Sequence, residues 1–325
     1  MPDLSIIIVN WNSADYLRAC LSTVYQHTRG ISFEIIVVDN ASPDDCETML
    51  AAEFPEVVLI RSAENLGFAR ANNLGFKYAK SPMLLFLNPD TEVHDDVLTR
   101  MTLWLTEHPA FGAAGARLLN TDKTLQESCV QAFPTILNQL LDSALLRRHF
   151  PASRLWGMQA LYRPSGTVEP VDAISGACFL TSRKSFEAAG QFTEDYFMYS
   201  DDLDLSYKIN RAGFKVAFLG DCEVTHHGGK SSERQSGQFA AVLQRESMEQ
   251  FFRMTRGRVY GILYRATMCA AALARVIAAG CLLLFGSLAR KQSAGRSALK
   301  KWTAVLAWSF GLHSSARYAG GRTHA

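Results

Sequence analysis

The sequence predicts an α/β fold built on a mostly parallel sheet that is flanked by helices. Short apolar runs such as 83–87 are too brief for helices and suit strands buried on both faces. Helix-like segments of about 10–15 residues separate these runs, and this alternation is typical of βαβ units. The third observation is that the apolar runs end abruptly in polar turns, as Asn88-Pro89-Asp90 ends the run 83–87.

The first 110 residues contain the clearest elements. The expected strands are rich in Ile and Val, which favour a pleated, buried environment. The expected helices repeat apolar residues on one face, as Phe68, Ala71 and Tyr78 do. In chain order we expect strand 4–9, a helix capped by Asn12 or Ser13, strand 33–38, helix 44–53, strand 57–60, a helix opened by 65–68, strand 83–87 and helix 95–107.

Polar residues stand at the ends of these strands. Pro89 cannot donate to a strand ladder, so the fourth strand must stop at Asn88. Right-handed crossovers place the carboxyl ends of such strands on one rim, where open α/β sheets bind ligands. Asn10, Asp39, Arg61, Asn88 and Asp90 should therefore converge there. A carboxylate beside an amide can hold a divalent cation on a diphosphate, although Asn-Pro-Asp-Thr alone is also an ordinary turn.

The middle of the chain is less regular. We expect a strand over 111–119, a helix over 134–151, a long loop to about 170 and renewed strand character over 171–181. A helix that includes Leu203 and Tyr207 should stop at Gly213. Two short strands, 215–219 and 222–225, should precede a sharp break at 226–229.

Composition points to an ordinary globular protein of 325 residues, with 48% hydrophobic and 20% charged residues. The seven cysteines are scattered and never form a Cys-x-x-Cys pair. This pattern argues against a disulfide framework and a zinc site, and it favours a reducing compartment. The N-terminus shows no basic segment followed by an apolar one, so no secretory signal is expected. These observations predict a cytoplasmic location.

Charge is distributed unevenly along the chain. Residues 250–325 contain 12 Lys and Arg and no Asp or Glu, whereas residues 1–249 contain 21 basic and 31 acidic residues. We expect a domain over 1–250, with halves of about 1–120 and 121–250, and a basic amphipathic helical tail over 251–325. Apolar runs with embedded Arg and Trp predict association with the inner face of the cell membrane rather than with nucleic acid. Packing on the first domain and an oligomer contact are the alternatives.

Two groups of residues could carry chemistry. Asp201, Asp202 and Asp204 form a tight acidic cluster, which reads either as helix N-terminal charge or as a general base with a raised pKa. His226 in a glycine-rich turn is either an ordinary polar residue of that turn or a ligand for a cation on a diphosphate.

Several motifs in one order resemble glycosyltransferase family 2, and more narrowly its bacterial rhamnosyltransferase-like branch. The resemblance spans roughly residues 4–235 and depends on the ordered set of motifs. The motifs are Ser5-Ile6-Ile7-Ile8-Val9-Asn10-Trp11-Asn12, Ile36-Val37-Val38-Asp39-Asn40-Ala41-Ser42, Asn65-Leu66-Gly67-Phe68-Ala69-Arg70-Ala71-Asn72-Asn73, Leu87-Asn88-Pro89-Asp90, Ser175-Gly176-Ala177, Asp201-Asp202-Leu203-Asp204-Leu205 and His226-His227-Gly228-Gly229-Lys230-Ser231.

This resemblance implies a GT-A fold and inverting sugar transfer from a nucleotide-activated donor. It implies that Asp202 is the catalytic base and that Ser175, Gly176 and Asp201 support the base and the acceptor. It further implies a divalent cation, Mg²⁺ or Mn²⁺, held by Asp90 and His226. The residues implied for nucleotide-sugar binding are Asn10, Asn12, Asp39, Asn65, Gly67, Arg70, Asn73 and Asn88.

Two positions depart from the family pattern. Asn88 replaces the first Asp of the Asp-x-Asp metal motif, which leaves Asp90 as the remaining carboxylate for the cation. Asp201 replaces the usual Glu beside the base. Metal dependence and the role of Asp201 are therefore the parts of the resemblance that need structural evidence.

The expected function is transfer of a sugar, rhamnose from dTDP-rhamnose being favoured, to a polyprenyl-linked or polysaccharide acceptor in cell-envelope glycan synthesis. A nucleotidyltransferase would want a glycine-rich, Arg-containing loop after the first strand, where this chain has Asn10-Trp11-Asn12-Ser13. A non-catalytic nucleotide-sugar-binding protein would not need the cluster around Asp202. The sequence leaves the acceptor and the oligomeric state open.

Overall fold

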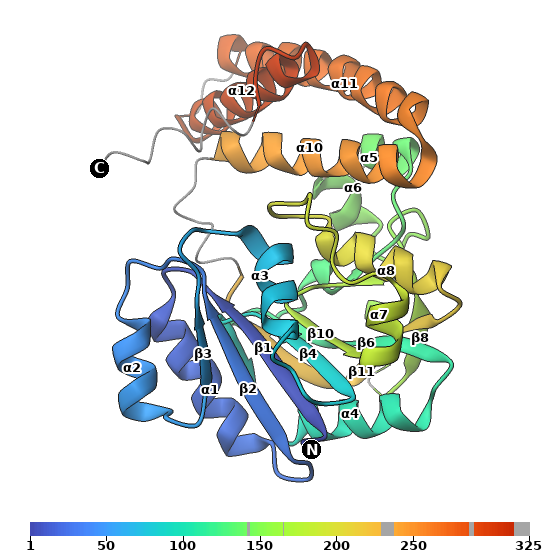
Figure 1. Ribbon diagram of the computed structural model, residues 1–325. Helices are drawn as coiled ribbons and strands as arrows, with labels where there is room; N and C mark the ends of the chain where they lie inside the picture. The colour runs from blue at the N-terminus through green and yellow to red at the C-terminus, as the bar shows by residue number, and fades with distance from the viewer. Residues whose placement is uncertain (142–143, 165, 229–236, 286–288, 315–325) are drawn as a thin grey trace. The chain divides into compact units, whose positions relative to one another are not determined.

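The computed structural model describes residues 1–141, 144–164, 166–228, 237–285 and 289–314. Gly229, Lys230 and Ser231 of the last family motif lie outside the described residues. The chain forms two compact units. The first comprises Met1–Phe133, Ser143–Phe197 and Asp201–Ser232, and the second comprises Pro134–Asp142, Met198–Ser200 and Glu233–Ala325. Figure 1 shows that the first unit contains the sheet and that the second is helical.

In the described part of the first unit, nine strands form one sheet in the order β3-β2-β1-β4-β10-β6-β11-β5, with β8 paired to β11. Two further strands, β7 and β9, form a small separate ladder. The strands are β1 Leu4–Asn10, β2 Phe33–Asp39, β3 Val58–Arg61, β4 Met83–Leu87, β5 Thr91–Val93, β6 Phe111–Leu119, β7 Val130–Gln131, β8 Val168–Val171, β9 Ala173–Ile174, β10 Cys178–Ser182 and β11 Lys215–His226.

The first four strands of the chain are parallel, as predicted. Their register pairs Asn10 with Asp39 and Asp39 with Arg61, and β4 ends beside β1 at Leu87. The polar residues that follow these strands therefore lie at one edge of the sheet. The prediction that the strand ends converge is confirmed.

The second half of the sheet is mixed and departs from the predicted elements. The segment 171–181 is divided among β8, β9 and β10, and β10 pairs antiparallel with both β4 and β6. The two short strands expected over 215–225 form the single strand β11, with an irregular register between Leu219 and Glu223. A bulge bends a strand without ending it, which explains why the polar Gly220-Asp221 resembled a turn.

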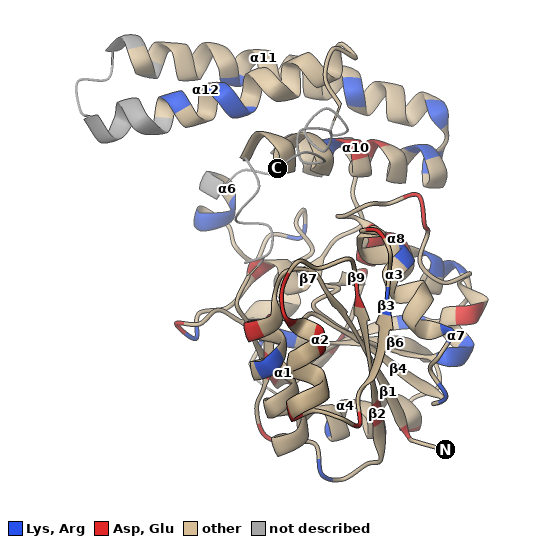
Figure 2. Cartoon of the chain, turned by 60° about the vertical axis from the view of Figure 1, so that its left-hand side comes forward, with Lys and Arg blue, Asp and Glu red and all other residues tan. Residues whose placement is uncertain are grey.

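Helices cover both faces of the sheet, and Figure 2 shows them on opposite sides of it. The helices α1 Ala14–His27, α2 Cys46–Glu53 and α4 Val97–Glu107 lie on one face, and α3 Gly67–Phe76, α7 Arg183–Ala188 and α8 Asp201–Arg211 lie on the other. Large side chains such as Phe86, Phe179 and Phe186 are fully buried in a cluster on the second face. This burial supplies most of the force that holds α3 and α8 in place.

The long helix expected over 134–151 is two short helices, α5 Ile136–Leu141 and α6 Ala144–His149. Two 3₁₀ helices, η1 Glu127–Cys129 and η2 Gln159–Tyr162, lie in the same region of the sequence. The segment 120–170 carries few regular apolar repeats, and such segments are the least predictable from periodicity.

The second unit contains the helices α10 Gly237–Arg256, α11 Arg258–Phe285 and α12 Ala289–Ser309, together with α5. The helix α10 runs through the domain boundary that we expected at residue 250. Gly257 takes a φ of +88° between α10 and α11, a conformation that ends helices at little cost for glycine. The ring of Phe252 on α10 packs against Tyr260 and Tyr264 on α11, and Tyr264 meets Trp308 on α12.

The packing of α3 on the sheet predicts the effect of enlarging Gly75. A Cβ atom at this helical glycine would lie 2.6 Å from Cγ2 of Ile7 and 3.1 Å from Cγ2 of Val38. We expect Gly75→Ala to destabilise the protein by about 1–3 kcal/mol, because overpacking forces neighbouring atoms apart. Urea unfolding would measure the change. Gly237→Ala, which adds a Cβ in open space, is the control, and equal stability of the two variants would contradict this packing.

Candidate active site

The loops that follow β1 and β2 are fastened to each other. Ser42 Oγ accepts the backbone N–H of Asn12 and lies 3.4 Å from Nδ2 of Asn10, which donates to it. Asp44 Oδ2 accepts the N–H of Ala14 at 2.9 Å, where α1 begins. Asn12 itself has a positive φ of 53°, a conformation that Asn tolerates better than most residues. These contacts fix the first two strand ends in one arrangement.

Two buried acceptor atoms in these loops lack a partner among the described residues. They are Oδ1 of Asn10 and Oδ1 of Asp39, and both residues were predicted to bind the nucleotide. Burial raises the pKa of Asp39, although the Asn10 side chain donates to it and lowers the pKa in part. A buried acceptor without a donor is costly, so this pair suits a ligand that brings N–H groups.

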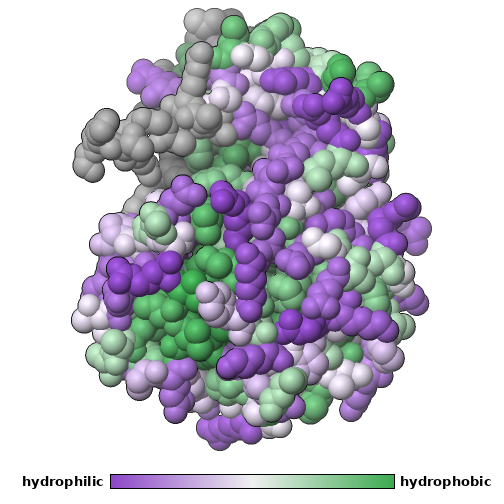
Figure 3. Space-filling model, viewed as in Figure 1, coloured by the Kyte–Doolittle hydropathy of each residue, from purple (hydrophilic) through white to green (hydrophobic). Residues whose placement is uncertain are grey.

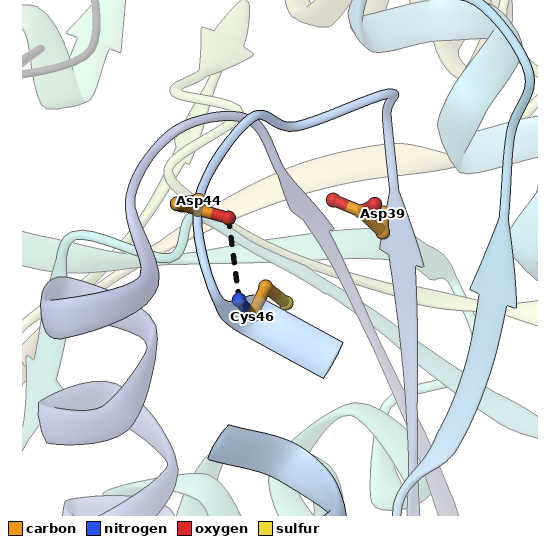
Figure 4. A group of neighbouring side chains, drawn as sticks. All are labelled: Asp39, Asp44 and Cys46. Atoms are coloured by element: carbon orange, nitrogen blue, oxygen red, sulfur yellow. Dashed lines mark hydrogen bonds between the residues drawn. The ribbon is translucent and has the colours of Figure 1, made fainter. Parts of the chain in front are cut away.

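Asp39, Asp44 and Cys46 form a group whose potential ligand atoms lie within 4.8 Å of one another. Figure 4 shows the three side chains at the end of β2 and the start of α2. Asp44 also accepts the N–H of Cys46, at 3.4 Å. Burial raises the pKa of the Cys46 thiol to about 12, and only a thiolate is a good metal ligand. We therefore interpret this group as an anchor for the loop rather than as a cation site.

The start of α3 depends on Gly67, one of the predicted donor-binding residues. Its φ is +76°, and a Cβ atom there would lie 2.4 Å from the carbonyl oxygen of Phe197. Asn65 Oδ1 accepts the N–H of Gly67 and the Nδ2 of Asn40, each at 2.9 Å. Only glycine fits this position, and the turn holds the first helical N–H groups near the sheet edge.

Arg70 and Asn73, also on α3, differ in accessibility. The Arg70 side chain is exposed, and its guanidinium lies 3.9 Å from Glu64. Asn73 is buried, and its Nδ2 donates to the Phe192 carbonyl oxygen while its Oδ1 accepts the Phe192 N–H. Arg70 is free to turn toward a diphosphate, whereas the amide of Asn73 is already used in packing. We therefore assign Asn73 a structural role.

The residues that follow β4 meet the end of β11. His226 Nε2 lies 3.3 Å from Asp90 Oδ1 and 3.3 Å from Asn88 Nδ2. The encounter follows from β5, which pairs antiparallel with β11 and sets Thr91 opposite His226. Asp90 is 6% exposed. The structure thus brings together the two residues predicted to hold the cation, and it places Asn88 beside them.

Gln126 holds His226 at two points and was not predicted. Its Oε1 lies 2.9 Å from Nδ1 of His226, and its Nε2 donates to the His226 carbonyl oxygen at 2.6 Å. Because the amide oxygen only accepts, Nδ1 must carry a proton. In the neutral form of the ring the lone pair is then on Nε2, where the Asn88 amide can donate to it. Gln126 is buried in a loop after β6. No sequence motif marked it, since its partner is 100 residues away.

Asp202 lies at the first turn of α8 and faces the turn before β10. Its Oδ2 accepts the N–H of Gly176, and its Oδ1 accepts the N–H of Leu203, both at 2.8 Å. A Cβ atom at Gly176 would lie 3.3 Å from Cβ of Asp202 and 3.4 Å from the ring of Phe68. The Ser175 Oγ accepts the N–H of Ala177 at 3.3 Å and shapes the same turn. The predicted base and its predicted supports are therefore neighbours.

The three acidic residues of α8 have different electrostatic environments. Burial, and then the charge of Asp202, raises the pKa of Asp201. Burial also raises the pKa of Asp202, but the N–H groups of Gly176 and Leu203 oppose the shift. Asp204 accepts from Thr193 at 2.6 Å and pairs with Lys208 at 3.3 Å. Asp202 is thus the first of the adjacent pair to ionise, Asp201 keeps its proton to higher pH, and Asp204 is committed to packing.

The contacts of Gln126 predict a single tautomer for His226 in the free protein. We expect the neutral ring to carry its proton on Nδ1, and we expect Gln126→Leu to give a mixture of tautomers. Side-chain ¹⁵N chemical shifts of His226 would measure both states. The exposed Gln26 on α1 provides the control variant Gln26→Leu. A ring protonated on Nε2 in the wild-type protein would contradict the assignment.

Comparison with known proteins gives a consistent family. The sequence model described as Glycosyl transferase family 2 matches residues 5–188. A low-salt glycan biosynthesis hexosyltransferase of Haloferax volcanii is 27% identical over 228 residues, which are 69% of this chain and 66% of that protein. An N-acetylglucosaminyl-diphospho-decaprenol L-rhamnosyltransferase of Mycobacterium tuberculosis is 25% identical over 74% of this chain and 80% of its own length. The rhamnosyltransferase WbbL of Escherichia coli K12 is 26% identical over 68% and 82%.

Solved structures agree on the fold. A mannosyltransferase of Pyrobaculum calidifontis, in complex with GDP-Man and Mn²⁺, has a TM-score of 0.56 at 19% identity and covers 96% of this chain and 87% of its own. Residues 1–349 of TarS of S. aureus give a TM-score of 0.50 at 14% identity, with 95% and 92% covered. The predicted GT-A architecture is confirmed. Since the family model spans more than half of its length, the chain belongs to glycosyl transferase family 2 and is a hexosyltransferase of the inverting type usual in that family.

Proposed function

We propose that this enzyme transfers rhamnose from dTDP-rhamnose to a polyprenyl-linked or polysaccharide acceptor in cell-envelope glycan synthesis. The observation that carries the proposal is the meeting of Asn88, Asp90 and His226 at the carboxyl edge of the sheet, beside the donor loops of β1 and β2. The choice of rhamnose is supported by two relatives named as rhamnosyltransferases, from Mycobacterium tuberculosis and Escherichia coli.

The donor base would occupy the loops after β1 and β2. Its ring N–H would satisfy one of the two unpartnered Oδ1 atoms, that of Asn10 or that of Asp39, with Asn12 lining the same loop. Thymine offers one such N–H, at N3. The ribose and diphosphate would then follow toward Asn65, Gly67 and the start of α3, where backbone N–H groups and the helix dipole favour negative charge. Arg70 would add a mobile positive charge on the same side.

The donor set fits a hard or borderline divalent cation such as Mg²⁺ or Mn²⁺. Asp90 supplies a buried carboxylate and His226 an imidazole whose Nε2 lone pair Gln126 orients. Asn88 turns its amide nitrogen toward His226, so it would offer its oxygen to a cation only after the amide rotates. A cation held there would neutralise charge on the departing diphosphate. One carboxylate rather than two gives a weaker site, so the donor phosphates would contribute substantially to binding.

Asp202 would act on the acceptor. Its carboxylate removes the proton from an acceptor hydroxyl, and that oxygen attacks the anomeric carbon of the sugar. The bond from this carbon to the diphosphate oxygen breaks, and the nucleoside diphosphate leaves from the opposite face, which inverts the configuration. The N–H groups of Gly176 and Leu203 hold Asp202 in one orientation. The buried Asp201 adds no second negative charge beside Asp202 while it keeps its proton.

We place the enzyme in the cytoplasm, at the inner face of the cell membrane. The support is the basic second unit, in which residues 250–325 carry no acidic residue. A peripheral position would bring Asp202 to an acceptor that remains anchored in the bilayer by a polyprenyl chain. Among the described helices, the segment Arg258–Cys281 is long and apolar enough to cross a membrane, which is weak evidence by itself.

The adjacent carboxyl groups of Asp201 and Asp202 predict different results for two similar variants. Asp202→Asn should lower turnover by about 10²–10⁴-fold, since it removes the base. Asp201→Asn should retain turnover within about tenfold, because Asn resembles a protonated Asp in shape and charge. The acid limb of kcat/KM should lie above the ordinary Asp pKa of about 3.9, since activity is lost as Asp202 takes up its proton. Steady-state release of dTDP, measured across a range of pH, would test these expectations. Near-normal turnover of Asp202→Asn would show that Asp202 is not the base.

Donor binding should depend on both the base loops and the cation ligands. A dTDP-rhamnose concentration of ~100 Kd should stabilise the protein by about 2.7 kcal/mol, visible as a rise in Tm, and UDP- and GDP-sugars should give less. Mn²⁺ should enlarge the rise, and Asp90→Asn should abolish only this additional part. Asp95→Asn, at an exposed carboxylate near α4, serves as the control. Binding and turnover that are unchanged in excess chelator would show that Arg70 and the helix N-terminus neutralise the diphosphate without a metal.

A further inference from the structure

The helix α11 carries a long apolar face that is exposed to solvent. From Val259 to Cys281, a segment that the structure describes throughout, every exposed residue is apolar. The largest of them are 50–71% exposed. The exposed positions are Val259, Ile262, Leu263, Ala266, Ala270, Leu273, Ala274, Ile277, Ala278 and Cys281. They recur every three or four residues, which aligns them along one side of the helix for about 33 Å. We call this surface the α11 outer face.

The two arginines inside this segment point to the opposite side of α11. Arg265 lies 3.5 Å from Glu249 on α10, donates to the Trp308 carbonyl oxygen at 2.7 Å and stacks over the Trp308 ring. Arg275 stacks over the ring of Trp302, 4.2 Å from its centroid. Both charges are therefore used within the helical unit. The sequence analysis counted such embedded Arg residues toward membrane association, and the contacts of these two within the helical unit remove them from that role.

Exposed positive charge remains at the end of α11 where the outer face begins and on α12, which packs beside α11. Arg253, Arg256 and Arg258 are exposed where α10 meets α11, and Lys300 and Lys301 are exposed on α12. Figure 2 shows basic and no acidic residues on the described parts of α11 and α12, and Figure 3 shows apolar residues interspersed with polar ones at the top of the view, where Figure 1 has these helices. An uncharged strip bordered by cations matches an anionic bilayer, which offers hydrocarbon below a layer of negative headgroups.

We propose that α11 lies in the plane of an anionic membrane, with the α11 outer face in the upper hydrocarbon region and the bordering Arg and Lys at the headgroups. The proposal rests on the proposed function only for its purpose, because a lipid-anchored acceptor requires a membrane-bound enzyme. It goes further in naming the face, the orientation and the residues that touch lipid.

Two other arrangements fit the contacts less well. If α11 crossed the bilayer, its inner side would carry α10 and α12 into hydrocarbon, because Tyr264, Met268 and Ala272 are buried on that side within the helical unit. That would also bring Arg265, Arg275 and Glu249 into the membrane. If a second copy covered the outer face, two units with 12 basic and no acidic residues over 250–325 would meet, and like charges oppose such a contact.

Vesicle binding of charge variants tests which face meets the lipid. The double variant Ile262→Glu/Ile277→Glu should bind vesicles of phosphatidylglycerol and phosphatidylcholine at least tenfold more weakly than the wild-type protein in co-sedimentation. Leu103→Glu, which places the same charge at an exposed leucine of α4, should bind like the wild type. All three proteins should show the same dTDP-rhamnose-dependent rise in Tm, which separates this test from failure of the proposed function. Wild-type binding should weaken with added salt.

Depth measurements test the orientation. Cys281 is exposed and Cys269 partly exposed, while the other five cysteines are buried, so Cys269→Ser/Cys281→Ser provides a background for single labels. A bimane dye at Leu263→Cys, Ala270→Cys and Ile277→Cys should be quenched by brominated lipids at one common, shallow depth. A deep central site between two shallow ones would show a spanning helix. Absence of vesicle binding at low salt would overturn the membrane assignment. A dimer in solution that the Ile262→Glu/Ile277→Glu variant dissociates into monomers would also overturn it.

Discussion

The parallel pairing of β1, β2, β3 and β4 is the constraint on which the site depends. Parallel strands align their carboxyl ends, and the register places Asn10 beside Asp39, with Asn88 just beyond β4. The candidate site is completed from the other half of the sheet. There the strand β11 runs parallel to β6 and antiparallel to β5, so that it delivers His226 to Asp90. Burial of the apolar strand residues thus stabilises the sheet, and the sheet holds its polar edge in a geometry that no loop alone could maintain.

Buried polar groups then differentiate residues that look alike in sequence. Asp201, Asp202 and Asp204 are close neighbours, yet their electrostatic environments differ. Asp201 is buried beside the charge of Asp202, Asp202 accepts two backbone N–H groups, and Asp204 pairs with Lys208. In the same way the side-chain oxygen of Asn10 lacks a partner, whereas the side-chain amide of Asn73 donates to the Phe192 carbonyl oxygen. The functional candidates are the polar groups that the fold holds in place and leaves incompletely paired.

The fold class and the proximity of most candidate site residues could be predicted because they depend on local patterns. Short apolar runs define β1 to β4, and the residues after most of them belong to short ordered motifs. Long-range pairing could not be predicted. The three-residue β5, the role of Gln126 on His226 and the division of 171–181 into three strands depend on partners distant in sequence. The tail shows the same limit. The sequence revealed Arg residues embedded in apolar runs, but it did not reveal that Arg265 stacks on Trp308 and Arg275 on Trp302.

The central claim is that this family 2 enzyme moves rhamnose with inversion from a thymidine-linked donor. The most direct measurement is the anomeric configuration of the product, determined by NMR after incubation of dTDP-rhamnose with a polyprenyl-linked sugar and the enzyme. The account predicts transfer to the acceptor, with the product linkage opposite in configuration to the donor linkage. A product that retains the donor configuration, or transfer from another nucleotide sugar with none from dTDP-rhamnose, would contradict it.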